Sequence, residues 1–114
     1  MQLAELAPRL MKVTLVGRLD TPGVDRIEAR FLAALVPTAD NAIVDMSQVD
    51  FISSMGIRML LSAARSLKMR QAALSLFNVQ DQVNQILEQV SIRQMIPVCR
   101  SEAEAQSAVT SPVS

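Results

Sequence analysis

The sequence has no histidine, tryptophan or tyrosine, and among its 114 residues it has three glycines and a single cysteine, Cys99. Without histidine, Ser-His-Asp and Cys-His catalysis, histidine metal ligands and histidine phosphotransfer are excluded. One cysteine can form neither an intramolecular disulfide nor a cysteine-based zinc site, and we expect Cys99 to be a small buried hydrophobe. With three glycines, no phosphate-binding loop or dinucleotide fingerprint is present. We therefore expect neither an enzyme active site nor a cofactor or metal site.

The sequence also lacks an excess of either charge, because 11 Lys and Arg balance 11 Asp and Glu. A neutral chain lacks the basic surface that binding to a nucleic-acid backbone requires, and three Phe in apolar contexts give no base-stacking platform. The N-terminus carries an acidic residue where a signal peptide would be basic, and no window reaches the ~18 apolar residues of a membrane span. We therefore expect a cytoplasmic protein that neither binds nucleic acid nor inserts into a membrane.

Half of the residues are hydrophobic, which suits one domain with a buried core. We expect that domain over residues 1–109 and a frayed tail over 110–114. Periodicity and turn residues predict strands over 2–7, 10–19, 42–46, 72–77 and 95–98, and helices over 21–35, 54–69, 79–90 and 101–109. This order predicts an α/β fold, with a mixed sheet of four to five strands and about four helices packed against it.

Several local features refine this prediction. Apolar residues on both faces of the strand over 10–19, Val16 among them, are typical of a central strand. Thr21 followed by proline is expected to cap the first helix. Ser101 and Glu104 are spaced as a capping box for the last helix.

The most informative stretch runs from Asp45 to Leu60. It leaves an apolar strand, crosses a short polar step over residues 47–50, and reaches two serines, Ser53 and Ser54. Apolar residues then recur at helical spacing. Because a serine before such a run caps the helix, Ser53 or Ser54 should sit at the positive end of a helix, where a phosphate is well tolerated.

Residues 49–57, Val-Asp-Phe-Ile-Ser-Ser-Met-Gly-Ile, resemble the signature of the STAS domain, as found in bacterial anti-sigma factor antagonists. The usual form there is an apolar residue followed by Asp-Ser-(Ser or Thr)-Gly-Leu. Ser54, Gly56 and Ile57 match it, whereas Ser53 replaces the family's Asp and Met55 replaces its second hydroxyl residue. Gly-Arg-Leu-Asp over residues 17–20 is a further STAS feature, and the element order agrees over roughly residues 10–108. The resemblance implies the STAS fold.

The resemblance also implies a function, that of an anti-sigma factor antagonist in a partner-switching circuit. The unmodified protein would bind an anti-sigma factor serine kinase and release a sigma factor or another client. The kinase, using ATP, would phosphorylate Ser54 and end the complex, and a PP2C-type serine phosphatase would restore it. The absence of the family's Asp at Ser53 implies a different partner specificity.

Matching the family positions gives a candidate partner-binding surface. Its expected members are Asp20, Ser53, Ser54, Met55, Gly56, Arg58 and Met59. Ser54 has a simpler interpretation as a helix cap, and Asp20 as a cap or Asx turn. Arg58 is either a ligand for a phosphate or an acidic partner group, or a solvated surface residue.

Met55 and Met59 are either core residues or adaptable contacts, and we favour a partly exposed contact for Met55.

Two other functions remain open. The STAS fold also serves as a non-phosphorylated subunit of transport or scaffold complexes, such as a lipid-transport ATPase, in which case Ser54 is only a cap. Small-molecule or nucleotide binding by the domain itself is the third, and it requires a pocket.

Overall fold

The computed structural model describes residues 1–38 and 40–110. The five strands are β1 (Gln2–Ala7), β2 (Leu10–Leu19), β3 (Asn41–Ile52), β4 (Leu74–Phe77) and β5 (Val98–Cys99). The helices are α1 (Thr21–Leu35), α2 (Ser54–Met69), α3 (Asp81–Gln89) and α4 (Glu102–Thr110), and a short 3₁₀ turn covers Ile92–Gln94. The strands form one mixed sheet in chain order, with β1 antiparallel to β2 and every other pair parallel. The predicted fold class is thereby confirmed.

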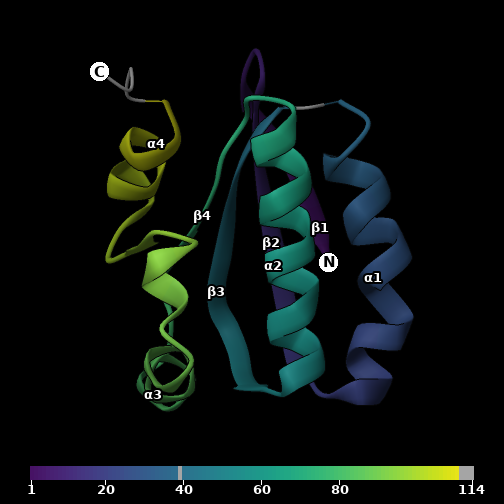
Figure 1. Ribbon diagram of the computed structural model, residues 1–114, viewed down its shortest axis with the longest axis vertical. Coiled ribbons are helices and arrows are strands. Elements are labelled where there is room, and N and C mark those ends of the chain that lie inside the picture. The colour runs from purple at the N-terminus through teal and green to yellow at the C-terminus, as the bar shows by residue number, and fades with distance from the viewer. Residues whose placement is uncertain (39, 111–114) are drawn as a thin grey trace.

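The helices cover the two faces of this sheet unequally. In Figure 1, α1 and α2 stand side by side over one face. There they enclose the main core, to which β3 contributes Ala42, Val44 and Met46. Ile43 points the other way, into a smaller core that α4 closes with Ala105. Because side chains alternate along a strand, the apolar residues over 42–46 of β3, which only Asp45 interrupts, serve both cores.

β3 is longer than the sequence predicts, because the polar step over residues 47–50 remains in the strand. Its inward residue Val49 is fully buried, while Gln48 and Asp50 are exposed. β2 pairs with this extension as far as Leu19 opposite Ile52, through two register irregularities. The chain therefore leaves β2 and β3 at neighbouring points.

Some predicted boundaries and exposures are wrong. β4 begins at Leu74 rather than at residue 72, because the chain first turns through Gln71, a residue with positive φ. β5 is confined to Val98–Cys99, because the amides of Met95 and Ile96 still donate to the Ile92 carbonyl oxygen at the end of the 3₁₀ turn. Val16, expected to be buried, is 52% exposed, because the core that α4 closes on the second face does not reach it within the described residues.

Two capping predictions also change. Asp20 rather than Thr21 caps α1, and Thr21 is the first helical residue. At α4, Ser101 Oγ accepts from the Glu104 amide at 3.2 Å, as a capping box requires. The Glu104 carboxylate, however, accepts from Arg100 N rather than from Ser101 N.

Two further expectations concern the C-terminal tail and membrane insertion. Thr110 belongs to α4 instead of the predicted tail, and residues 111–114 lie outside the described residues. Within the described ranges, no helix has the length and apolar character needed to cross a bilayer.

Candidate partner-binding site at the start of α2

Two strand-to-helix junctions lie together at one end of the sheet. β2 runs into α1 through Asp20, and β3 runs into α2 through Ser53. Ser53 connects them, because its amide (2.9 Å) and its hydroxyl (2.8 Å) both donate to the Leu19 carbonyl oxygen. The same hydroxyl accepts from the Gly56 amide at 3.4 Å, which caps α2. Ser53, half-buried, is thus a structural residue of the site.

Ser54 has a different environment from its neighbour. It is the first residue of α2 and is exposed. Since Ser53 provides the cap, the interpretation of Ser54 as the helix cap is wrong. The Ser54 hydroxyl makes no hydrogen bond to any other residue in the described ranges. It is therefore a nucleophilic oxygen held at the positive end of a 16-residue helix and open to solvent.

Gly56 and Met59, both expected at the partner surface, lie inside the protein. A Cβ on Gly56 would be 2.8 Å from Ile52 Cγ1 and 3.0 Å from the Leu19 carbonyl oxygen. Glycine at this position lets α2 approach the ends of β2 and β3. Met59 is fully buried in the main core, because it follows Met55 by one helical turn on the inward side of α2. Neither side chain position is accessible to a partner on the folded domain.

Met55 and Arg58 frame the accessible part of this site. Met55 is half-buried against the core, which agrees with a partly exposed residue. Arg58 is exposed one helical turn after Ser54. A shallow depression of about 380 Å³ is lined by Ser54, Ile57, Arg58, Leu61, Ser62 and Arg65. The guanidinium groups of Arg58 and Arg65 give this depression a positive potential.

Asp20 supplies the negative charge of the neighbouring junction. Its Oδ1 accepts from the Gly23 amide at 2.9 Å, and Arg18 Nε donates to its Oδ2 at 3.3 Å. The Gly23 hydrogen bond, aided by Arg18, lowers the pKa of Asp20. Arg18 also lies over the Phe51 ring, 4.4 Å from its centroid. Asp20 is thus an N-cap, as the simpler interpretation predicted, and its contact with a partner stays a prediction.

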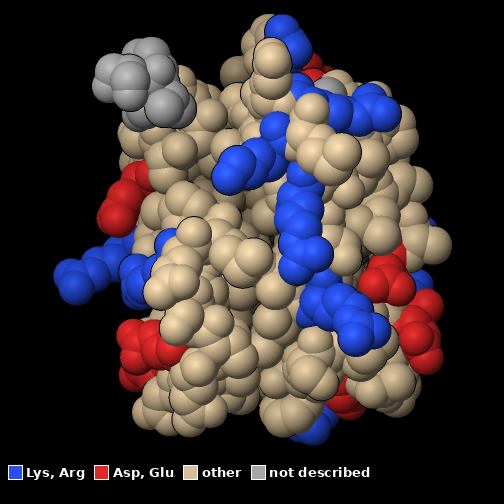
Figure 2. Space-filling model, in the orientation of Figure 1, with Lys and Arg blue, Asp and Glu red and all other residues tan. Residues whose placement is uncertain are grey.

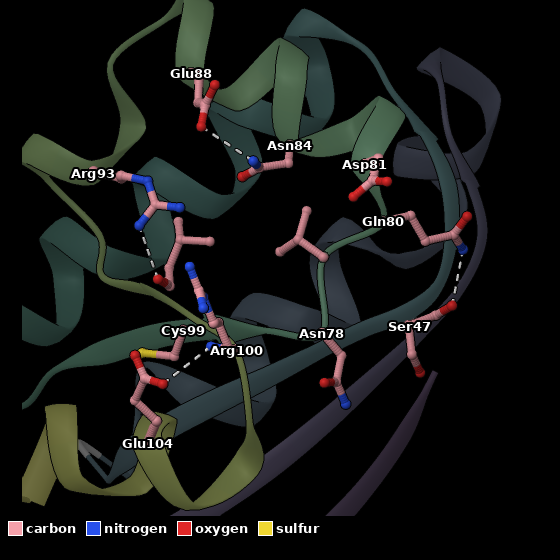
Figure 3. A pocket seen from close by; sticks show the side chains of 12 residues that line it. Ser47, Asn78, Gln80, Asp81, Asn84, Glu88, Arg93, Cys99, Arg100 and Glu104 are labelled. Carbon is pink, nitrogen blue, oxygen red and sulfur yellow. Dashed lines mark hydrogen bonds between the residues drawn. The ribbon is translucent and has the colours of Figure 1, made fainter.

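A second hollow lies elsewhere, past the ends of β4 and β5 (Figure 3). Its volume is about 740 Å³, and it shares no lining residue with the depression at Ser54. Sequence reasoning did not find it, because its lining comes from loops and helix ends far apart in the chain. Asn78, Asp81, Asn84, Glu88, Arg93, Cys99, Arg100 and Glu104 are among the lining residues.

Most polar groups of this hollow bond to one another. Arg93 donates to the Val98 carbonyl oxygen at 3.1 Å, and Asn84 Nδ2 donates to Glu88 Oε1 at 3.2 Å (Figure 3). Asn84 Oδ1 is buried and accepts no hydrogen bond from the described residues. Cys99 is buried there, as predicted, and burial raises the pKa of its thiol, so the thiol stays protonated and poorly nucleophilic at neutral pH. The described residues contain no cluster of three or more Asp, Glu or Cys able to hold a metal ion.

A family model supplies the identity of this fold. The model of the STAS domain matches residues 3–105. The chain belongs to the STAS domain family. In this STAS domain, Asp20 lies at the junction of β2 and α1, and Ser53 and Ser54 lie at the adjacent junction of β3 and α2.

Individual relatives agree with this assignment. The candidate anti-sigma factor antagonist BtrV of Bordetella bronchiseptica is 27% identical over 94 residues, which cover 82% of this chain and 81% of BtrV. The anti-sigma factor antagonist SpoIIAA in its unphosphorylated form superposes with a TM-score of 0.76 at 21% identity, covering 99% of this chain and 98% of SpoIIAA. The phosphorylated form from Bacillus gives a TM-score of 0.69 at 19% identity and covers 94% and 96%.

The same fold occurs in proteins of another kind. A sulfate transporter family protein from Wolinella succinogenes superposes with a TM-score of 0.75 at 18% identity, covering 92% of this chain and 88% of that one. At such identities the structural likeness establishes the fold alone. The choice between functions therefore depends on the site.

Proposed function

We propose that this STAS domain is an anti-sigma factor antagonist, a binding module rather than an enzyme, that acts in a cytoplasmic partner-switching circuit. The working domain is the predicted one, residues 1–109, extended by Thr110 at the end of α4. In its unmodified form it binds an anti-sigma factor serine kinase, and this releases a sigma factor or another client. The observation that carries the proposal is the exposed Ser54 hydroxyl, which is free of the capping role because Ser53 performs it.

Phosphorylation of Ser54 by the kinase, using ATP, ends the complex. A phosphate would add about −1.5 to −2 charges at the positive end of α2. The helix tolerates this charge, so the modification acts on the docked partner by steric exclusion and by repelling its acidic groups. A PP2C-type serine phosphatase reverses the step, and the exposure of Ser54 gives both enzymes access.

The names and solved structures of the relatives support this role. BtrV carries an antagonist's name, and SpoIIAA, with the same fold, has been solved both with and without phosphate. Ser54, Gly56 and Ile57 retain the signature positions, while Ser53 and Met55 depart from it. Because Ser53 is committed to the Leu19 carbonyl oxygen, the departure changes the charge of the junction and leaves Ser54 accessible. We expect a kinase adapted to this uncharged position.

The test is an affinity capture from host lysate with three baits: wild type, Ser54→Ala and Ser54→Asp. Wild type and Ser54→Ala should retain an ATP-binding anti-sigma factor kinase, and Ser54→Asp should lose it. The purified kinase should then phosphorylate wild type but not Ser54→Ala. Equal retention of a kinase by Ser54→Ala and Ser54→Asp would refute the switch.

The transporter neighbour supports one alternative, a STAS subunit of a transport or scaffold complex, such as a lipid-transport ATPase. In that case all three baits should retain the same membrane ATPase, and no kinase should be enriched. The two functions therefore give opposite patterns in one experiment.

A further inference from the structure

The solvent face of α2 carries charge of one sign only. Its charged residues are Arg58, Arg65 and Lys68, all exposed, and the helix contains no Asp or Glu. They are seven and three residues apart, which places them along one side of the helix. Figure 2 shows basic side chains in a column over α2, with acidic side chains at either side of it. We call these three residues the basic stripe.

The stripe is a product of charge segregation, since the whole chain is neutral. α1 carries two acidic and two basic residues, whereas α3 and α4 carry acidic residues only. Solvent-exposed helices more often intersperse opposite charges, because neighbouring like charges repel. The stripe lacks that compensation, and a partner of opposite charge would supply it.

Apolar atoms lie beside the stripe. A small hollow of about 140 Å³ between α2 and the 3₁₀ turn is lined by Leu61, Ala64, Arg65, Lys68, Gln94 and Met95. Met95 is 54% exposed and Met69, at the end of α2, is 86% exposed. Flexible methionines suit adaptable contact surfaces, and a mixed apolar and basic surface matches an acidic amphipathic one.

We propose that the basic stripe docks an acidic surface of the anti-sigma factor kinase, a surface with carboxylates on either side of an apolar ridge. This inference rests on the proposed function and extends it from Ser54 along the length of α2. The Met95 and Leu61 hollow receives the apolar ridge, and Arg65 and Lys68 pair with the carboxylates. The stripe accelerates association by steering the partner onto the face that contains Ser54.

The stripe also explains how a modification at one end of α2 affects the whole surface. Arg58 lies one turn from Ser54. A phosphate on Ser54 would compete with the partner's carboxylates for this guanidinium. Phosphorylation of Ser54 then makes Arg58 unavailable to the partner, and the phosphate repels the partner's carboxylates at the same point.

The experiment measures association rate constants with the host's purified anti-sigma factor kinases at low and high salt. The test variant is Arg65→Glu with Lys68→Glu, which leaves Ser54 and Arg58 unchanged. The control is Arg30→Glu with Arg100→Glu, which changes the net charge equally at exposed sites outside α2. A neutral variant, Arg65→Gln with Lys68→Gln, removes the charges with a smaller risk of a folding defect. Circular dichroism checks that all three double variants are folded.

We expect the test variant to associate about tenfold or more slowly at low salt, the neutral variant to be intermediate and the control to stay near wild type. The difference should shrink as salt rises. Equal slowing by the test and control variants, or wild-type rates for the test variant, would overturn the stripe as a docking surface.

Ser54→Asp is measured in the same series. If it binds as well as wild type, the switch at Ser54 fails, whatever the stripe variants do. If it binds weakly while the stripe variants match wild type, only the stripe inference fails.

Discussion

At the scale of single residues, two adjacent serines perform different tasks. Ser53 has its hydroxyl between the Leu19 carbonyl oxygen and the Gly56 amide, whereas Ser54 faces solvent. Their substitution by alanine should therefore separate stability from binding. Ser53→Ala should lower the free energy of unfolding by about 1 kcal/mol, as loss of an N-cap does. Ser54→Ala should change it by less than about 0.5 kcal/mol.

Urea denaturation of the two variants measures the difference in stability, and kinase capture measures the difference in binding. Ser54→Ala should bind without being phosphorylated, while folded Ser53→Ala should still be phosphorylated. A stability loss for Ser54→Ala equal to that of Ser53→Ala would show that Ser54 shares the cap.

The sequence located this pair but could not assign the roles. Both serines precede the apolar periodicity, and cap preference alone does not distinguish neighbouring positions. The distinction arises from Leu19, whose carbonyl oxygen is brought to Ser53 by strand pairing across 34 residues. Met59 was misplaced for a related reason: the residue type suits a core and a contact surface equally, and only packing decides.

At the scale of elements, the site depends on how closely α2 approaches the sheet. Gly56 allows that approach, since a Cβ there would meet Ile52 and the Leu19 backbone at 3.0 Å or less. Gly56→Ala should therefore destabilise the domain by about 1–2 kcal/mol, because the overpacking outweighs the gain in helix propensity.

Thermal and urea unfolding test this prediction against Ser62→Ala, which makes a helix-favouring change on the half-buried side of α2. Ser62→Ala should be neutral or slightly stabilising. If Gly56→Ala were to stabilise the domain as well, the close approach of α2 would have no energetic weight.

The elements themselves were largely predictable, because periods of two and 3.6 residues are set by the local chain. All five strands and four helices occur in the predicted order. The main error was the end of β3, where polar residues suggested a break. Pairing with β2 overrides that local preference, so the strand continues to Ile52.

At the scale of the whole molecule, a neutral composition hides an uneven distribution of charge. The neutral composition could not reveal the basic stripe, because the stripe depends on the face of α2 on which each charged residue lies. Likewise, the 740 Å³ hollow appears only when β4, β5 and α3 come together. Net charge and periodicity are one-dimensional measures, whereas a docking surface is a property of the assembled fold.

The proposed switch requires that this assembled fold survive the added charge. Ser54 is the first residue of α2, where a negative group interacts favourably with the helix dipole by about 0.3–1 kcal/mol. Ser54→Asp should therefore keep the far-ultraviolet circular dichroism of wild type, with a free energy of unfolding unchanged or higher by up to about 1 kcal/mol. The protein phosphorylated at Ser54 should behave in the same way.

Asp at a half-buried α2 position two turns beyond the helix start, as in Ser62→Asp, is the control, because it adds the same charge without the dipole benefit. It should be less stable than Ser54→Asp in urea denaturation. If Ser54→Asp instead unfolded more easily than wild type by over about 1 kcal/mol, its loss of kinase binding would report a damaged domain. With the fold intact, the loss has to arise at the surface, where the phosphate meets the partner.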